Sequence, residues 1–133
     1  MVIREQLESY AAGQAADRIA ISEIEAQSKR ASTPREAPHP TAREHWDVDN
    51  AVHELVWRGS GNAVLGKLTS DLRLRTRMFD LDRLPEHFRP ACDEHLALLT
   101  TLAEGDADKA SEAMRIHIKN ACQGIFDDHF KTL

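Results

Sequence analysis

The fold class is decided by residues 41–62, which read TAREHWDVDNAVHELVWRGSGN. Apolar side chains such as Trp46, Val52 and Val56 recur every three or four residues, which is the spacing of an amphipathic α-helix. We therefore expect a helix over residues 41–58. The glycines that follow can adopt the left-handed conformation that ends a helix, and Asn62 can cap the start of another one. This stretch thus predicts two helices joined by a tight turn.

The same helical spacing continues outside this stretch, and β-branched residues are sparse, which argues against strands. Residues 32–40 contain three prolines and are predicted to form a loop. In the segment after Asn62 we expect Leu65, Leu68, Leu72 and Arg75 to share the inward face. The chain is predicted to be all-α, an antiparallel bundle of about six helices. The other five helices are expected at about residues 2–18, 21–29, 63–79, 83–103 (with a possible break near Pro90) and 107–131.

Four side chains in this pattern have the chemistry of metal ligands. Asp49 and His53 are four residues apart, so a helix projects them from one face, one turn apart. His95 and His117 stand singly in the apolar stripes of two later helices that one turn connects. We expect all four to converge on a divalent metal ion, with zinc, nickel, manganese or iron favoured over calcium by the three imidazoles. The alternative is that each histidine is a hydrogen-bonded residue of the core.

Other residues near these four have weaker claims to a role. His45 precedes Asp49 by one turn, and Cys92 precedes His95 by three residues, so either could approach the metal. A hydrolase would also need a general base, for which Glu54 and Glu94 are the sequence neighbours. Neither glutamate lies in a motif that demands catalysis, so we expect no enzyme and no catalytic residues.

Two arginines interrupt apolar stripes. Arg75 does so in the helix predicted at residues 63–79, and Arg4 lies beside Ile3 and Leu7. A half-buried guanidinium binds a carboxylate bidentately, either in a structural salt bridge or in a ligand. Close to a metal, the second alternative predicts that a small organic acid is captured.

Composition narrows the class of protein. The 133 residues are expected to form one domain, and a net charge of -5 argues against non-specific nucleic-acid binding. No apolar run is long enough to cross a membrane, and the first residues lack the layout of a signal peptide. Cys92 and Cys122 form no paired motif, which favours thiols in a reducing compartment. We therefore expect a cytoplasmic protein without a membrane partner.

Several short motifs, taken together and in order, resemble the effector-binding domain of GntR-type bacterial transcriptional regulators. The resemblance is to the FadR subgroup, whose all-helical effector domain is called FCD. It spans almost the whole sequence. The motifs are Arg4-x-x-Leu7-Glu8, Ala11-Ala12, Ala15-Ala16-x-Arg18, Asp49-x-x-x-His53, Ser60-Gly61-Asn62, Glu94-His95, Gly105-Asp106 and His117-Ile118.

The resemblance implies a regulatory function. Members usually bind a divalent metal through residues that correspond to Asp49, His53, His95 and His117, and a small carboxylate effector that reaches an arginine, here Arg4 or Arg75. It also implies a homodimer. Such regulators carry a winged helix-turn-helix before this domain, and the sequence has none, so we expect one effector-binding and dimerisation domain over residues 1–133 that contacts DNA only through the missing part. The alternatives are a metal-stabilised dimerisation module and a metal-dependent hydrolase or lyase.

Overall fold

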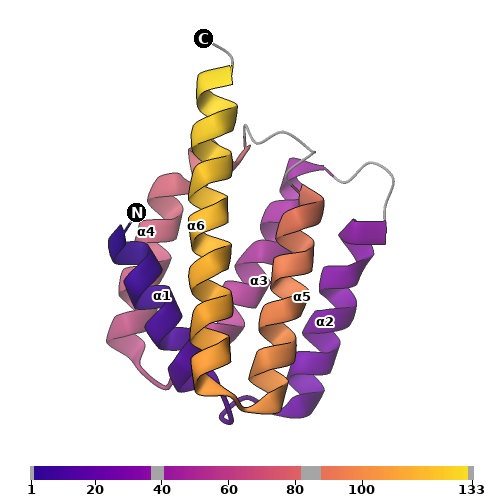
Figure 1. The fold of residues 1–133 in the computed structure, drawn as a ribbon, viewed down its shortest axis with the longest axis vertical. Helices are drawn as coiled ribbons and strands as arrows, with labels where there is room; N and C mark the ends of the chain where they lie inside the picture. The colour runs from indigo at the N-terminus through magenta and orange to yellow at the C-terminus, as the bar shows by residue number, and fades with distance from the viewer. Residues whose placement is uncertain (1, 37–40, 82–87, 132–133) are drawn as a thin grey trace.

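Helices account for almost all of the chain (Figure 1). The computed structural model describes residues 2–36, 41–81 and 88–131, and within them there is no strand. The prediction of an all-α fold is therefore confirmed. The helices are α1 (Val2–Ala15), α2 (Ile21–Glu36), α3 (Ala42–Ser60), α4 (Ala63–Leu81), α5 (Phe88–Glu104) and α6 (Ala107–Lys131).

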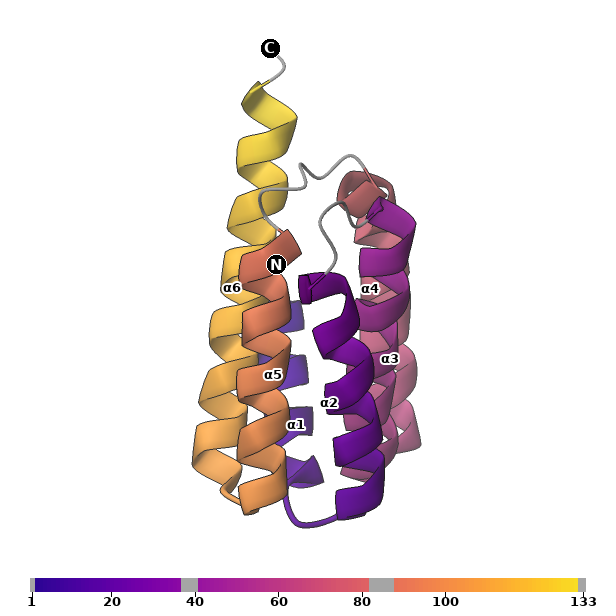
Figure 2. The same ribbon diagram turned by 90° about the vertical axis from the view of Figure 1, so that its right-hand side faces the viewer.

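The helices pack around a shared interior. α1 lies against α6 and α3, α2 lies against α5 and α3, and α4 packs on the outer side of α3 (Figures 1 and 2). α1 contributes small side chains to the core, and α5 and α6 contribute larger ones. The buried apolar residues of these three helices include Ala11, Ala12, Ala15, Leu98, Leu99, Leu102, Met114 and Ile118.

The capping contacts predicted for Gly61 and Asn62 are present, and Thr41 adds a cap that was not predicted. Thr41 caps α3 by accepting a hydrogen bond from the Glu44 backbone at 3.0 Å, and Gly61 ends the helix with φ of 70°. The Asn62 side chain then caps α4 by accepting from the Leu65 backbone at 3.0 Å. Polar caps of this kind satisfy backbone N–H groups that have no partner inside the helix. Both ends of the Gly61 turn are therefore fixed by local sequence.

Helix boundaries differ from the prediction at α1, which ends at Ala15 and not at residue 18, and at two places where prolines were expected to exclude helix. The predicted loop at residues 32–40 begins too early, since α2 continues through Pro34 to Glu36. A proline inside a helix removes one backbone hydrogen bond and crowds the carbonyl four residues earlier, and here both costs fall near the C-terminal end of α2. Pro90 does not break α5 either, because it is the third residue, where backbone N–H groups have no helical partner. Residues 83–87 of the predicted fifth helix lie outside the described residues.

The inward face of α4 was predicted correctly only in part, at Leu65, which is buried, and at Leu72, which is partly buried. Leu68 is 48% exposed and Arg75 is exposed, whereas Thr69 and Arg73 are buried. The Thr69 hydroxyl donates to the Leu65 carbonyl at 2.9 Å, which makes its burial tolerable. Apolar spacing alone therefore selected only part of the buried stripe of this helix.

Across the described segments, no helix combines the length and the apolar character needed to cross a membrane.

Candidate metal centre

The centre is built on α3, which contributes two of the four predicted ligands. Asp49 and His53 lie one helical turn apart and face the interior, with exposed fractions of 7% and 0%. The Asp49 Oδ1 atom is 3.3 Å from the Nε2 atom of His53. Because α3 is capped at both ends and packed between α1 and α4, the positions of these two side chains are well defined.

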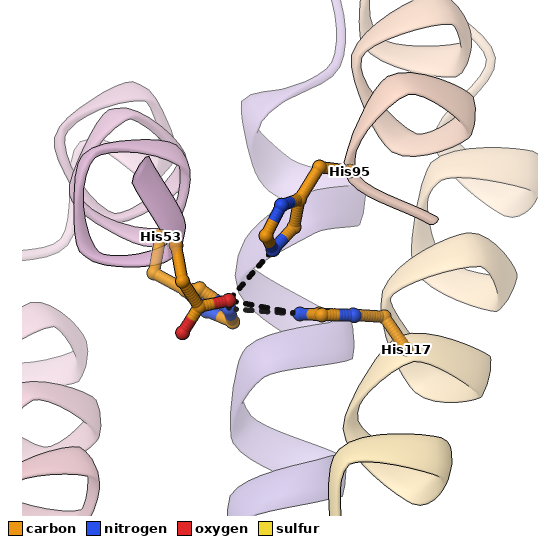
Figure 3. A group of neighbouring side chains, drawn as sticks. His53, His95 and His117 are labelled. Atoms are coloured by element: carbon orange, nitrogen blue, oxygen red, sulfur yellow. Dashed lines mark hydrogen bonds and ion pairs between the residues drawn. The ribbon is translucent and has the colours of Figure 1, made fainter. Parts of the chain in front are cut away.

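The other two predicted ligands reach the same point from α5 and α6. The Nε2 atom of His95 lies 2.6 Å from Asp49 Oδ1, and the Nε2 atom of His117 lies 3.3 Å from it. Figure 3 shows the three imidazole rings pointing toward one point from three helices. One potential ligand atom from each of the four residues lies within 4.8 Å of all the others. The structure thus brings together the four residues that the sequence singled out.

Two glutamates hold the outer sides of these rings. The Oε1 atom of Glu8 on α1 is 2.5 Å from His53 Nδ1, and the Oε1 atom of Glu94 on α5 is 2.9 Å from His117 Nδ1. Glu94 in turn accepts a hydrogen bond from Asn120 at 2.7 Å. Carboxylates at this position are typical of metal-binding histidines, because they fix the tautomer and the ring orientation.

The hydrogen bonds to the glutamates decide which nitrogens of His53 and His117 can accept at the middle of the centre. If Nδ1 of His53 and of His117 each donates to a glutamate, both Nε2 atoms present lone pairs. These two Nε2 atoms are only 3.2 Å apart, and each is 3.3 Å from the carboxylate oxygen of Asp49. Three acceptors facing one another need a positive charge between them. A proton can bridge two of them, whereas a divalent cation binds all three.

The spacing of these atoms also suits a metal ion. Donors bound at about 2.1 Å to one ion lie roughly 3–4 Å from each other. The separations of 3.2 and 3.3 Å fall in this range, whereas the 2.6 Å contact of His95 is that of a hydrogen bond. The donor set of one carboxylate and three imidazoles therefore fits a divalent metal with little rearrangement.

The electrostatics of the centre keep its ligands in their binding forms. Burial alone would raise the pKa of Asp49, but the Arg73 guanidinium and the His53 ring hold it well below its usual range. Burial lowers the pKa of His95 to about 4, against the opposing effect of its hydrogen bond to Asp49. Burial also acts to lower the pKa of His117, but hydrogen bonds to Asp49 and Glu94 outweigh it and raise the pKa. His117 is thus the ring on which a proton competes with a metal.

Comparison with known families identifies the fold. The family model described as the FCD domain matches residues 1–120. The chain belongs to the FCD domain family. The prediction from the sequence motifs is confirmed at this level.

A solved structure shows the same arrangement of helices. The metal-free FCD domain of TM0439, described as a candidate transcriptional regulator, superposes with a TM-score of 0.76 and 22% sequence identity. The match covers 97% of this chain and 90% of that one. At this identity the likeness establishes the fold alone. No curated protein sequence is significantly similar.

The arginines of this FCD domain are placed differently from the prediction. Arg75 is exposed and does not reach the centre, whereas Arg73, two residues earlier, is buried with its Nη2 atom 2.8 Å from Asp49 Oδ2. The Arg4 guanidinium is buried too, but its Nε atom lies 2.5 Å from Glu8 Oε2, so Arg4 acts on the centre through Glu8. Arg73 was not predicted, because the inward face of α4 was assigned from its leucines. The buried face in fact continues from Leu65 through Thr69 to Arg73.

The remaining candidates lie around the four ligands and not among them. The His45 ring stacks on Phe88 at 4.6 Å and lies 6.2 Å from the His95 ring. Cys92 is buried on α5, outside the cluster of four potential ligands found in the described residues. Glu8 is the other residue that the sequence analysis missed as a member of the centre. Glu8 was quoted only as part of the motif Arg4-x-x-Leu7-Glu8, whose spacing of four residues permits an ion pair between Arg4 and Glu8 on one helix face.

Proposed function

We propose that this FCD domain is the ligand-sensing domain of a bacterial transcriptional regulator and that it binds one divalent metal ion. Asp49, His53, His95 and His117 would hold the ion, which we expect to be zinc, nickel, manganese or iron. The observation that carries the proposal is the convergence of these four buried side chains, whose potential ligand atoms all lie within 4.8 Å of one another. The glutamates behind two of the rings support the same conclusion.

The proposed effector is a small organic carboxylate. Its carboxylate would take a position on the metal that the protein leaves to water, next to the Arg73 guanidinium. Arg73 replaces Arg75 in this role because it already lies against a carboxylate at the centre. Arg4 would contribute through Glu8 and not by direct contact with the effector.

Burial of the centre explains why such an effector would act as a signal. All four ligand residues and Arg73 are at most 7% exposed, so an incoming acid must displace packed side chains. A ligand shifts a conformational equilibrium by its difference in affinity for the two states. In an intact regulator the displaced packing would change how the DNA-binding part is held. The neighbour in structure is itself described as a candidate transcriptional regulator.

An enzymatic role receives less support from the same geometry. Glu94 already accepts the hydrogen bond of His117 Nδ1, and Glu54 is 55% exposed, with its carboxylate 4.0 Å from Arg58. A metal ion would lie on the Nε2 side of the rings. Neither Glu54 nor Glu94 is placed to act there as a general base toward a metal-bound water. This arrangement favours binding over turnover.

The metal site is tested by elemental analysis of tag-free protein after incubation with zinc, nickel and manganese salts. We expect about one divalent ion per chain in the wild type, and loss of the ion in Asp49→Asn and His117→Ala. Asp47→Asn is the matched control, because Asp47 lies on the same helix but is 52% exposed. Absence of metal from the wild type would contradict the proposal and leave the dimerisation module as the better explanation.

Effector binding needs a separate test. Small mono- and dicarboxylates are screened for an increase in the melting temperature of the zinc-loaded protein. An increase that disappears in Asp49→Asn and persists in Asp47→Asn would support the sensor. If no carboxylate changes the stability of protein that does hold zinc, the sensing role is wrong and the metal is structural.

We also propose that the domain forms a homodimer. Large apolar side chains are exposed on α1 and α4, which contact each other and lie on one side of the bundle in Figure 1. Among them, Ile3 is 66% exposed, Tyr10 56% and Val64 72%. Exposed apolar side chains gathered on neighbouring helices are typical of a protein interface.

A further inference from the structure

The buried face of α1 changes its chemistry along the helix. In its second half the helix buries alanines, Ala11, Ala12 and Ala15. In its first half the buried residues are Arg4 and Glu8, while Val2 and Ile3 are 68% and 66% exposed. The fully buried attachments of the first two turns are therefore charged side chains, next to the partly buried Leu7.

Glu8 is the contact through which this half of α1 meets the metal centre. One carboxylate oxygen lies 2.5 Å from His53 Nδ1, and the other lies 2.5 Å from Arg4 Nε. Glu8 and His53 are both 0% exposed, and Arg4 is 3% exposed. A buried carboxylate is stable only when nearby positive charge or hydrogen-bond donors compensate it. The two contacts of Glu8 supply that compensation from α1 itself and from the candidate ligand on α3.

We propose that Glu8 is a positioning residue that orients His53 toward the metal and so couples metal binding to the docking of the first half of α1. This inference rests on the proposed metal site. Glu8 does not touch the ion; it accepts the Nδ1 proton of His53 and leaves Nε2 with its lone pair toward the centre. Without Glu8 the ring can place its proton on either nitrogen and can rotate.

The coupling works in both directions. An ion on Nε2 draws electron density from the ring and makes the Nδ1–H a stronger donor, so the contact to Glu8 strengthens when metal binds. By thermodynamic linkage, anything that holds Glu8 in place then strengthens metal binding by the same factor. α1 would thus be more firmly docked in the metal-bound protein.

Glu94 provides a matched comparison on another helix. It holds His117 in the same way, but it lies on α5 and is also bound by Asn120 of α6. Its loss should therefore weaken metal binding without loosening α1. The difference between Glu8 and Glu94 separates the coupling to α1 from a general effect on the metal.

The first measurement is the zinc affinity of the wild type, Glu8→Gln and Glu94→Gln, determined by competition with a chromophoric chelator. Removing such an outer partner typically weakens metal binding about 10- to 100-fold, and we expect losses in this range for both variants. Glu112→Gln serves as the control, because Glu112 is an exposed residue of α6. In the nitrogen NMR spectrum of zinc-free protein, the His53 ring should carry its proton on Nδ1 in the wild type and in Glu94→Gln, and should show both tautomers in Glu8→Gln.

The second measurement is amide hydrogen exchange over residues 6–10 of α1, without zinc and at saturating zinc. Zinc should slow exchange at these amides in the wild type and in Glu94→Gln, but not in Glu8→Gln. If the charge of Arg4 prevents Glu8→Gln from folding, the double variant Arg4→Met with Glu8→Gln removes both buried charges and takes its place.

The outcomes separate this inference from the proposed function. If the wild type binds zinc but Glu8→Gln binds it equally well, Glu8 is not a positioning residue. If zinc binds and leaves the exchange of α1 unchanged in the wild type, the coupling is wrong although the metal site stands. If the wild type does not bind zinc at all, the proposed function itself fails, and this inference fails with it.

Discussion

Arg73 shows how a charged residue is accommodated inside this bundle. Its Nη2 atom is 2.8 Å from Asp49 Oδ2, and its guanidinium lies 4.7 Å from the centre of the Trp46 ring. The carboxylate neutralises the charge, and the aromatic face provides a further favourable contact for a cation. Arg73 thus compensates Asp49 from the side opposite the histidines.

This arrangement predicts a difference between two neighbouring arginines. Arg73→Met removes the partner of a buried carboxylate and should destabilise the metal-free protein by about 3–5 kcal/mol. Arg75→Met should change the stability by less than about 0.5 kcal/mol, because Arg75 is exposed. Urea unfolding with a chelator present measures both values. Zinc should restore part of the loss in Arg73→Met by compensating Asp49, and equal losses in the two variants would contradict this account.

The sequence could predict the four candidate ligands but not their charged neighbours. Asp49 and His53 have the spacing of one helical turn, and His95 and His117 interrupt apolar stripes, so each leaves a signal in the pattern. Arg73 lies between Leu72 and Leu74 in a segment where leucines and arginines alternate, and this alternation does not distinguish it from Arg75. The burial of Arg73 depends on how α4 rotates against α3, which is decided by tertiary packing.

Among the connections, the turn between α5 and α6 is fixed by a contact with the turn that follows α1. Gly105 has φ of 72°, and a Cβ atom built there would lie 1.8 Å from Asp17 Oδ1. Asp17 also has a positive φ, of 71°. The two turns therefore fit together only because residue 105 has no side chain.

Gly105→Ala should therefore lower the stability clearly. The left-handed conformation alone costs about 1–2 kcal/mol for a residue with a Cβ atom, and the displacement of Asp17 adds to it. Gly13→Ala is the matched control: its Cβ would meet nothing closer than 3.5 Å, inside α1. There alanine should stabilise by about 0.5–1 kcal/mol. Thermal unfolding of both variants checks the signs, and a stabilised Gly105→Ala would refute the account of the turn.

At the scale of the elements, the sequence predicted helix ends better where caps are present than where prolines are. Thr41, Gly61 and Asn62 each make the contact that their residue type favours. Pro34 and Pro90 were expected to exclude helix, yet both lie within one. Pro90 is in the first turn of α5, where backbone N–H groups have no helical partner, and Pro34 is followed by only two more residues of α2. Capping residues therefore predicted the helix ends better than prolines did.

For the whole molecule, the buried ionisable groups predict how stability depends on pH in metal-free protein. Burial would raise the pKa of Glu8, but His53 and Arg4 lower it from 4.5 to about 2, and burial lowers that of His95 from 6.5 to about 4. Between its folded-state and its unfolded-state pKa, each group binds more protons in the unfolded chain than in the folded protein. Stability is therefore lost as the pH falls from about 6.5 to about 2. The raised pKa of His117 acts in the other direction, so its contribution is complete below 6.5 and is lost as the pH rises through its folded-state value.

The metal-free protein should accordingly be most stable near pH 6.5, the ordinary pKa of histidine. Calorimetric melting temperatures across the pH range, with chelator present, measure this maximum. Glu8→Gln should flatten the profile only below about pH 4.5, where Glu8 binds more protons in the unfolded chain. A melting temperature that stays constant between neutral and mildly acidic pH would contradict the burial of His95 in its neutral form.

The exposed apolar side chains of α1 and α4 predict the state of assembly. Leu68→Glu places a charge beside Val64 on this surface and should shift the molecular mass in solution from dimer to monomer, because burying a charge without a partner is costly. Ile116→Glu is the control, because Ile116 is 42% exposed on α6. Light scattering on a sizing column reads both masses, and a wild-type monomer would rule out the proposed dimer.

The four candidate ligands lie far apart along the chain, with His117 placed 68 residues after Asp49. A complete set of donors therefore exists only after α3, α5 and α6 have packed together, so we expect the ion to bind after the transition state for folding. An ion that binds so late stabilises the native state and not the transition state that precedes it. Zinc should slow unfolding many-fold and leave the refolding rate nearly unchanged, which stopped-flow measurements can read. A regulator built on such a domain would keep its metal through brief depletion, because release has to wait for the helices to separate.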